Sequence, residues 1–374
     1  MFKFFKLIIN LKLYFSKPQK KRILIYDKGS YKYASYLFKK NKYIFYDTRY
    51  ESLNIYVLFF TLLKNGIFKL KQNYKFNFFS FVSPKIIFTA IDNNPSFYTL
   101  KSLYKKSIYV SLQNGMRDNW FINEVKKIKK KQKINFFADH IFVFGENEKL
   151  KMQKVIKGNY HIIGNVKNNY YSKKRKKSFP IKSLVFISQY KRGRNIRSFN
   201  DDFLKNEKLI FNKLIDYSKS SGLNLKICSA LRTAESMENK ASQENFFRKT
   251  FKEGNWKVLY RKSLEKTYNY FNPSQLIVFR WSTLGFENLA KGMKCVAFYK
   301  NFPVQGINKY KKKGIFWSNS QKYTEIKKII ERVIKIPNYK WEKISNKYSY
   351  DILFFDYKNL KIKKILRDCL VKNY

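Results

Sequence analysis

The sequence predicts an α/β protein made of two Rossmann-like domains, each built on a parallel sheet. Apolar runs of strand length alternate with helical patterns of about ten to fifteen residues, which is typical of parallel strands joined by right-handed crossovers. The alternation stops at the basic run Lys173–Lys177, which ends at Pro180, and then starts again. The 374 residues are enough for two domains of about 150 to 190 residues, each with its own core.

The first domain is predicted to contain five strands, and we assign residues 22–172 to it. These strands are Arg22–Tyr26, Tyr43–Tyr46, Ile86–Thr89, Ser107–Leu112 and His140–Phe144. Helices are expected near Tyr31–Lys40 and over Leu53–Lys64, the first of them after the turn Asp27–Ser30. Residues 173–182 form the predicted linker.

The second domain is predicted over residues 183–336 and again has five strands. These strands are Leu184–Ile187, Leu225–Cys228, Lys257–Tyr260, Leu276–Phe279 and Lys294–Phe298. The tail after Pro337 is rich in apolar residues, among them Trp341, Ile352 and Phe354. It therefore predicts C-terminal helices over residues 337–374 rather than a disordered end.

The segment Leu276–Phe298 reads as a complete β-turn-α-β unit. Its turn carries Ser282 and Thr283, which can cap the helix that follows. The first backbone N–H groups of a helix lack intrahelical partners, and with the helix dipole they favour an anion. We therefore predict a phosphate site here, with Glu287 one turn further on and placed to reach a sugar hydroxyl. The alternative is an ordinary Ser/Thr cap.

Other candidate donor-binding residues follow the first strands of the second domain. Ser188, Gln189 and Arg192 come after one strand, and Arg232 after the next. The planar guanidinium of Arg232 could hold a diphosphate as the leaving group develops charge. The alternative for the arginines around Arg192 is a solvated loop.

In the first domain the candidate residues also follow strands, because open parallel sheets bind ligands at the carboxyl ends of their strands. Asp92 could act as a general base on an acceptor hydroxyl, and Asn93 is its neighbour. Gln113 and Asn114 could hydrogen-bond sugar hydroxyls, and Arg117 suits an anionic group. The sequence Asn114-Gly115 could equally be a plain turn.

Ser282–Gly292 resembles the Ser-Thr-Leu-Gly-Tyr-Glu-x-Leu-Ala-x-Gly signature of surface-carbohydrate biosynthesis transferases, GT-B-like proteins that assemble bacterial lipopolysaccharide and capsule sugars. Five further segments are similar to that family in type and in order: Asp92–Phe97, Gln113–Arg117, Ala138–Gly145, Gly164–Asn169 and Phe186–Tyr190. Members of the family often carry an acidic residue directly before the Ser-Thr pair, whereas this chain has Trp281.

The resemblance implies a GT-B-like fold, with an acceptor domain and a nucleotide-donor domain facing across a cleft and C-terminal helices that cross back to the first domain. It implies a cytoplasmic glycosyltransferase that moves a sugar from a nucleotide-activated donor to a surface polysaccharide or lipopolysaccharide acceptor. The nucleotide-sugar is a substrate, and no cofactor or metal is expected. Inversion by direct displacement is the simpler mechanism, with Asp92 as base.

The sequence is also compatible with other functions. Within the same fold they are a sugar-nucleotide 2-epimerase and a polyol-phosphate transferase. In another class the alternative is a non-catalytic basic protein that binds anionic lipid or nucleic acid. No Gly-x-Gly-x-x-Gly fingerprint follows the first strand and no P-loop is present, which disfavours dinucleotide-dependent oxidoreductases and P-loop nucleotidases.

The formal net charge of +54 does not indicate a specific nucleic-acid reader. The basic residues are 66 Lys against 13 Arg, spread along the whole chain. Readers of specific sequences use Arg for bidentate contacts and concentrate charge on one face. The diffuse lysine charge predicts only a long-range attraction for anions.

Cysteine and histidine are too few for a metal or disulfide framework. Cys228, Cys295 and Cys369 are far apart and odd in number, which fits a reducing compartment. His140 and His161 are the only histidines, and no Cys/His spacing resembles a metal site. We expect His140 to open the fifth strand, away from the ligand-binding edge.

Residues 1–21 form a basic and aromatic N-terminal segment. Its first sixteen residues lack the uninterrupted apolar core of a signal peptide and are too short and too charged to span a membrane. One interpretation is a helix that lies in the headgroup region and holds the protein peripherally on the inner face of the cell membrane. The other is a first helix packed on the domain.

Overall fold

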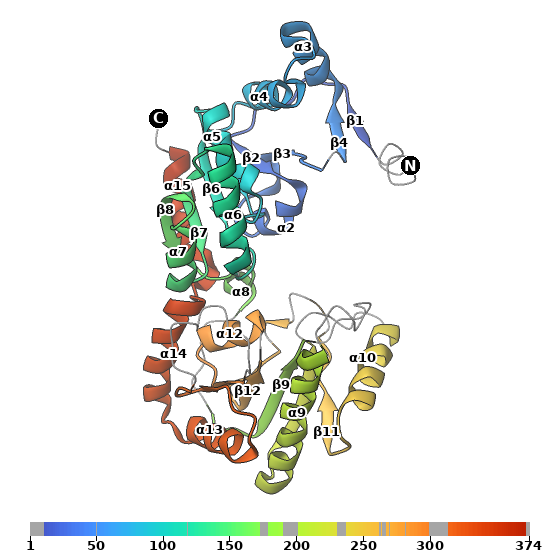
Figure 1. Ribbon diagram of the computed structural model, residues 1–374, viewed down its shortest axis with the longest axis vertical. Coiled ribbons are helices and arrows are strands. Elements are labelled where there is room, and N and C mark those ends of the chain that lie inside the picture. The colour runs from blue at the N-terminus through green and yellow to red at the C-terminus, as the bar shows by residue number, and fades with distance from the viewer. Residues whose placement is uncertain are drawn as a thin grey trace. The chain divides into compact units, whose positions relative to one another are not determined.

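The computed structural model divides into two compact units. One comprises Met1–Lys167 and Asn359–Tyr374, and the other Asn168–Lys358. The residues that the structure describes are 11–49, 51–117, 119–172, 179–189, 201–229, 237–261, 263, 267–268, 270–280, 282–298 and 313–371. Each unit is a parallel sheet with helices on its faces (Figure 1), so the two Rossmann-like domains are confirmed.

The first unit contains a six-stranded sheet in the order β3-β2-β5-β6-β7-β8, and every neighbouring pair is parallel. The strands are β2 (Ile23–Tyr26), β3 (Tyr43–Tyr46), β5 (Ile86–Thr89), β6 (Ile108–Leu112), β7 (Phe137–Val143) and β8 (Lys157–Ile162). All residues of β2, β5 and β6 are buried, as expected for strands covered on both faces. The five predicted strands are present, and β8 is an additional one.

The helices of the first unit differ from the expectation at two places. They are α2 (Tyr31–Ala34), α3 (Ile55–Asn65), α4 (Leu70–Val82), α5 (Leu100–Leu103), α6 (Asn119–Gln132) and α7 (Glu146–Met152), and α8 (Val166–Tyr171) begins in this unit and ends in the second. The helix expected over Leu53–Lys64 begins only at Ile55, because Leu53 and Asn54 belong to a strand. The helix expected to reach Lys40 ends at Ala34, so that prediction was too long. After Ala34 the chain forms tight turns, one of which is closed by a hydrogen bond of 3.0 Å from the Leu37 amide to the Ala34 carbonyl. In this segment Leu37 and Phe38 pack against the core.

The prediction of a helix over the first sixteen residues was wrong for its C-terminal part. Residues 1–10 lie outside the described residues. Lys12–Tyr14 form strand β1, which pairs in parallel with β4 (Ser52–Asn54). The backbone of this segment is therefore satisfied by a neighbouring strand, which an isolated reading of its apolar pattern cannot anticipate.

His140 does not open its strand, which corrects the expectation. β7 begins at Phe137, and a register irregularity separates Phe137 from His140. His140 Nδ1 lies 2.9 Å from Nε2 of His161 on the adjacent strand β8. Burial, with His140 and Lys361 nearby, lowers the pKa of His161 to about 4.

The second unit repeats the design with the strand order β11-β10-β9-β12-β13-β14, again parallel throughout. The strands are β9 (Ser183–Ser188), β10 (Asn224–Ser229), β11 (Trp256–Val258), β12 (Gln275–Phe279), β13 (Cys295–Phe298) and β14 (Trp317–Ser318). Its helices are α9 (Asp201–Ser221), α10 (Met237–Thr250), α12 (Thr283–Ala290), α13 (Tyr323–Lys335) and α14 (Asn338–Ile352). The five predicted strands are present, and β14 is additional.

The C-terminal helix α15 (Leu360–Val371) belongs to the first unit, as the expected return of the tail requires. Its Ile362, Leu366 and Cys369 are buried in the same core as strands β2 and β5. Lys85 Nζ caps the end of this helix by donating to the Leu370 carbonyl at 2.9 Å.

The chain divides slightly before the segment that we assigned as the linker. The division lies between Lys167 and Asn168, inside α8, whereas the linker was placed at 173–182. Asn169 accepts a hydrogen bond from the Asp356 amide at 3.1 Å, which ties the end of α8 to the second unit. Residues 173–178 lie outside the described residues.

Helix α12 packs directly on β12, and Gly285 makes this possible. A Cβ at position 285 would lie 2.3 Å from the Phe279 ring, far inside contact distance. The glycine is therefore required by close helix–sheet packing rather than by its backbone conformation.

Replacing Gly285 with Ala should destabilise the second unit by about 1–3 kcal/mol, because the extra methyl group overpacks a buried contact. Urea denaturation of the purified protein measures this difference. The control is Gly115→Ala, whose Cβ would meet nothing closer than 3.6 Å. Equal stability of the two variants would contradict the packing argument.

Candidate functional site

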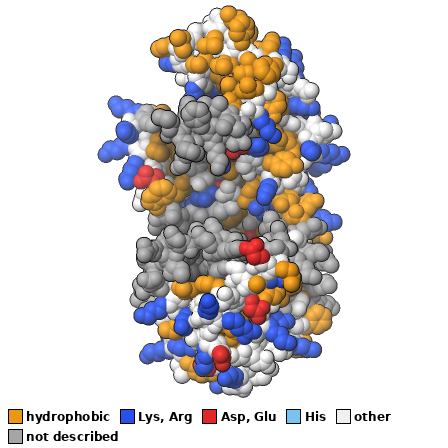
Figure 2. All heavy atoms as spheres, turned by 90° about the vertical axis from the view of Figure 1, so that its right-hand side faces the viewer, with side chains coloured by type: hydrophobic (Ala, Val, Ile, Leu, Met, Phe, Trp, Pro, Cys, Tyr) orange, Lys and Arg blue, Asp and Glu red, His pale blue; other side chains and the backbone are white. Residues whose placement is uncertain are grey.

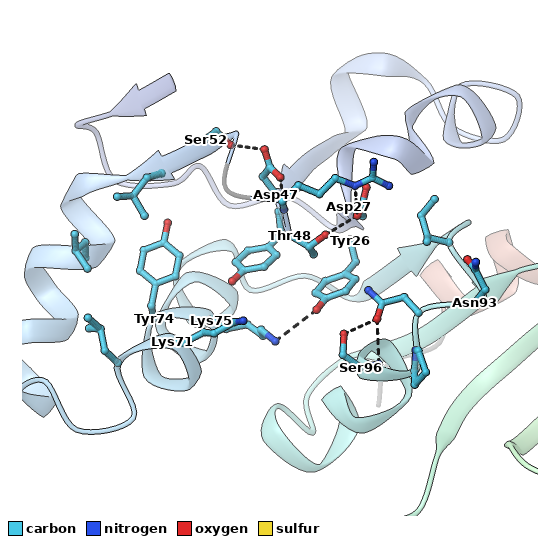
Figure 3. A pocket seen from close by; sticks show the side chains of 18 residues that line it. Tyr26, Asp27, Asp47, Thr48, Ser52, Lys71, Tyr74, Lys75, Asn93 and Ser96 are labelled. Carbon is cyan, nitrogen blue, oxygen red and sulfur yellow. Dashed lines mark hydrogen bonds and ion pairs between the residues drawn. The ribbon is translucent and has the colours of Figure 1, made fainter. Parts of the chain in front are cut away.

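A pocket of about 670 Å³ lies in the first unit, at the carboxyl ends of β2 and β3 (Figure 3). Residues from three parts of the unit line it: the ends of these strands, the α3–α4 segment and the chain after β5. This is the edge at which parallel sheets bind ligands. Its size is typical of a site for a small molecule or a sugar unit.

Tyrosine side chains form the apolar wall of the pocket. The rings of Tyr26 and Tyr46 stack with centroids 5.6 Å apart and an interplanar angle of 6°. Tyr74 on α4 adds a third ring, 6.4 Å from that of Tyr46, and its hydroxyl accepts a hydrogen bond from the Asn54 amide at 2.9 Å. Neighbouring side chains fix these rings, which form a rigid apolar wall of the pocket.

Carboxylates and their partners form a polar wall. Asp27 is buried and accepts hydrogen bonds from the Gly29 amide at 2.7 Å, the Thr48 hydroxyl and Arg49 Nε at 3.2 Å. Asp47 accepts from the Arg49 amide at 2.8 Å and from the Ser52 hydroxyl at 3.1 Å. Asp27 holds a positive φ of 76°, an uncommon conformation for a non-glycine residue.

Two lysines from α4 complete the pocket. Lys75 Nζ donates to the Tyr26 hydroxyl at 3.4 Å (Figure 3) and lies 5.8 Å from the centroid of the same ring. Burial, followed by the charge of Lys71, lowers the pKa of Lys75. Two cationic groups on one wall favour a ligand that carries an anionic group.

Asp92 and Arg117 form a buried ion pair in the same unit. Arg117 Nε donates to Asp92 Oδ2 at 2.8 Å, and its terminal nitrogen Nη2 contacts the other carboxylate oxygen and Asn114 Oδ1. The Asn114 amide also donates to Asp92, at 3.1 Å. Burial raises the pKa of the Asp92 carboxyl, and the Arg117 guanidinium opposes that rise.

Gln113 organises the loop that carries Arg117. Its side-chain amide donates to Glu148 Oε2 at 2.5 Å and to the Gly115 carbonyl at 2.9 Å, while its carbonyl accepts from the Phe144 amide at 2.7 Å. Glu148 in turn accepts from the Arg117 amide at 3.0 Å. Gln113 is therefore fully engaged within the protein.

The structure thus separates the predicted acceptor residues. Asp92, Gln113, Asn114 and Arg117 come together in one buried network, whereas Asn93 lies on the rim of the pocket. Both carboxylate oxygens of Asp92 are occupied by donors. This arrangement holds the Arg117 guanidinium in place, and the role of Asp92 as a base stays a prediction.

In the second unit Ser188 and Gln189 lie at the carboxyl edge of the sheet, as predicted. The Gln189 amide donates to Glu207 on α9 at 2.8 Å, and Ser188 also hydrogen-bonds this carboxyl. Arg280, at the end of β12, interacts electrostatically with Glu207. Burial raises the pKa of Glu207 to about 7, against these partners.

Ser282 takes the N-cap position of α12, but its side chain makes no capping hydrogen bond. Its backbone carbonyl accepts from the Gly285 amide at 3.0 Å, and Thr283 is half-buried at the first helical position. Glu287 is buried and faces the charges of Lys291 and Arg261. Burial lowers the pKa of Lys291 to about 8, and Glu287 opposes this. The predicted contact of Glu287 with a sugar stays a prediction.

Two predicted donor residues, Arg192 and Arg232, lie outside the described residues. The three tyrosines of the pocket, Tyr26, Tyr46 and Tyr74, and its two carboxylates were not among the predicted site residues. The available signal was the turn Asp27–Ser30 after the first strand, which we assigned only as the start of a helix.

Over the described part of the chain, no group of His, Cys, Asp and Glu could hold a metal ion. No helix there is long and apolar enough to cross a membrane.

A family model described as an O-antigen biosynthesis protein matches residues 110–370 of the chain. Among curated proteins, no sequence matches it. Similar solved structures include a protein from Listeria monocytogenes assigned as a UDP-N-acetylglucosamine 2-epimerase, which is 12% identical with a TM-score of 0.53, over 96% of this chain and 98% of that chain.

The UDP-GlcNAc 2-epimerase of Methanocaldococcus jannaschii, solved in complex with UDP-GlcNAc and UDP, is also similar. It is 12% identical with a TM-score of 0.50, over 94% of this chain and 100% of that chain. At such identities the likeness shows the fold, which is GT-B-like.

Replacing Glu207 with Gln should remove a pH-dependent contribution to stability. The pKa of Glu207 is about 7 in the folded state, and that of an unfolded glutamate is about 4.3. Between these values only the unfolded chain releases the proton, so the free energy of unfolding falls as the pH rises.

The difference in unfolding free energy between wild type and Glu207→Gln should therefore decline by an amount of the order of 3 kcal/mol from pH about 4.5 to 7. Urea titrations across this range measure it, with Glu342→Gln on α14 as a control for the substitution. A difference that does not change with pH would contradict the buried, near-neutral carboxyl.

Proposed function

This chain belongs to the O-antigen biosynthesis protein family, and we propose that it is a glycosyltransferase that moves a sugar from a nucleotide-activated donor to an O-antigen glycan acceptor. One observation carries the proposal: the pocket of the first unit combines stacked tyrosine rings with carboxylate, amide and ammonium groups. Rings suit the apolar face of a sugar, and the polar groups suit its hydroxyls.

The acceptor is assigned to the pocket of the first unit. Asp47 lines this pocket and is half-buried, and a carboxylate oxygen can accept more than one hydrogen bond, so we assign Asp47 to acceptor hydroxyls. Asn93 and Lys71 lie on the exposed rim. The ammonium groups of Lys71 and Lys75 select an acceptor with a carboxylate or phosphate near the reacting sugar.

The donor is assigned to the second unit. Ser188, Gln189 and Ser282 lie at the carboxyl ends of its strands, and Arg192 and Arg232 follow two of them in the sequence. Arginine and helix N-terminal amides can stabilise a departing diphosphate without a metal ion. The two epimerase structures, one of them holding UDP-GlcNAc and UDP, support a nucleotide-sugar as the donor class.

The ion pair of Asp92 and Arg117 holds a guanidinium in a fixed position at the edge of the first sheet. We assign Asp92 as the residue that positions this guanidinium, and its action as a general base requires that Arg117 release one carboxylate oxygen. A direct displacement with inversion remains the simplest reaction course.

The donor assignment predicts that UDP raises the melting temperature of the protein, because a ligand that binds the folded state stabilises it. Replacing Arg232 with Ala should lower the affinity for UDP about tenfold, which is the usual loss for one charged hydrogen bond, and so reduce the rise in melting temperature. The matched control is Arg367→Ala on the exposed side of α15. Unchanged UDP affinity in Arg232→Ala would remove Arg232 from the site.

The acceptor assignment predicts that Lys71→Ala/Asn93→Ala slows transfer to purified O-antigen fragments but leaves UDP binding unchanged. The control pair Lys130→Ala/Asn123→Ala changes the same residue types on the exposed face of α6. Transfer is measured as UDP release from UDP-GlcNAc and other UDP-sugars, with and without the fragments. Conversion of the donor sugar to its 2-epimer, with no acceptor required, would instead establish the epimerase alternative.

A further inference from the structure

Helices α3 and α4 form a hairpin (residues 55–82) with a large exposed apolar surface. Ten of the twenty large hydrophobic side chains that are exposed in the described residues belong to this hairpin or to the β1 segment beside it. We define the hairpin patch as Tyr56, Phe59, Leu62, Leu63, Ile67 and Phe68. Figure 2 shows hydrophobic side chains gathered over this end of the first unit, with lysine and arginine around them.

The most exposed members lie at the tip of the hairpin. Gly66 ends α3 with a positive φ of 61°, and Ile67 and Phe68 follow it with 81% and 74% of their surface exposed. A glycine C-cap fixes the direction in which the chain leaves the helix. The two most apolar residues of the turn are therefore presented to the surroundings by a defined local structure.

The opposite face of the hairpin is well packed, so the patch does not result from a loose fold. Asn77 on α4 donates to the Thr61 hydroxyl at 3.0 Å and to Asn65 Oδ1 at 3.3 Å on α3. The rings of Phe60 and Phe81 lie 4.9 Å apart across the two helices. The buried polar contacts and ring packing hold the helices together while the patch faces outward.

The charge of the hairpin is entirely positive. Residues 55–82 contain Lys64, Lys69, Lys71 and Lys75 and no Asp or Glu, although the chain has 25 acidic residues. The ammonium groups of Lys64 and Lys69 lie over the rings of Phe60 and Phe68, at 5.8 and 5.2 Å from the centroids. Positive charge therefore borders the apolar patch directly.

We propose that the hairpin patch docks on an anionic lipid bilayer. Bulky Phe, Leu and Ile side chains enter the boundary between headgroups and acyl chains, and lysines beside them pair with anionic headgroups. Contiguous exposed apolar surface of this kind marks an interaction site. A protein partner would need its own acidic rim, whereas the bilayer supplies both the apolar layer and the negative charge.

Docking through the hairpin has a consequence for the pocket that rests on the proposed function. Leu58, Leu70, Lys71, Tyr74 and Lys75 belong to the hairpin and line the pocket. The pocket therefore lies next to the docked surface. An acceptor sugar that is joined through a phosphate to a lipid in the bilayer could reach the pocket without leaving the membrane.

The docking is tested by co-sedimentation of the full chain with vesicles of phosphatidylcholine alone or mixed equally with phosphatidylglycerol. Ile67→Ser/Phe68→Ser should lower the affinity for the anionic vesicles by at least about tenfold, because two exposed side chains lose their burial in lipid. Lys64→Glu/Lys69→Glu should lower it as well and reduce its dependence on salt. Both pairs are exposed, so the melting temperature should stay unchanged.

Matched controls separate the hairpin patch from the rest of the chain. Trp120→Ser/Tyr339→Ser removes two exposed rings elsewhere, and Lys130→Glu/Lys131→Glu reverses two exposed charges on α6. Equal losses in these controls would mean that diffuse charge binds the vesicles, and would overturn the proposal. So would vesicle binding that disappears on deletion of residues 1–10 but survives Ile67→Ser/Phe68→Ser.

A second copy of the chain is the remaining occupant to distinguish. Light scattering gives the oligomeric state of wild type and Ile67→Ser/Phe68→Ser. A wild-type dimer that the variant converts to monomer, with vesicle binding unchanged, would overturn the proposal in favour of self-association. Because vesicle binding is read without donor or acceptor, failure here leaves the transferase proposal intact, and failure of transfer leaves the docking intact.

Discussion

The burial of parallel strands on both faces is the constraint on which the rest of the structure depends. All residues of β2, β5 and β6, and all of β9, β12 and β13, are buried. Such strands have no place for functional polar side chains along their length, so these side chains lie where each strand ends. Asp27, Asp92 and Arg117 in the first unit and Arg280 in the second follow a strand in this way, and Ser188 is the last residue of β9.

Buried carboxylates in this highly basic chain are matched by cations. Asp27 contacts Arg49, Asp92 contacts Arg117, and Glu207 interacts with Arg280. A buried charge without a partner is strongly unfavourable, and the planar guanidinium satisfies two carboxylate oxygens at once. Three of the 13 arginines therefore serve as partners of buried carboxylates, while the excess of lysine gives the surface its general attraction for anions. Composition alone predicted the second role and not the first.

The sequence was sufficient for the strands and for part of the site. Apolar runs such as Ile86–Thr89 predict their own structure because burial on both faces leaves no polar alternative. Asp92 and Arg117 could be placed at the edge of the first sheet for the same reason, but not their mutual ion pair, which depends on the loop that Gln113 holds. The pocket could not be predicted. Tyrosine is abundant in this chain, and the three rings that line the pocket come from separate elements.

The proposed docking of the α3–α4 hairpin on a bilayer gives a reason why one surface of this two-domain protein departs from the usual polar exterior. In a protein that meets its acceptor in solution, exposed Ile67 and Phe68 would only promote aggregation. When the acceptor is held in a bilayer, the same residues keep the protein on the membrane surface, where it meets the acceptor by diffusion in two dimensions. They also orient the pocket, because the same helices line it. The local fold then links both properties, because the turn at Gly66 presents the apolar tip while α4 carries Tyr74 and Lys75 into the pocket.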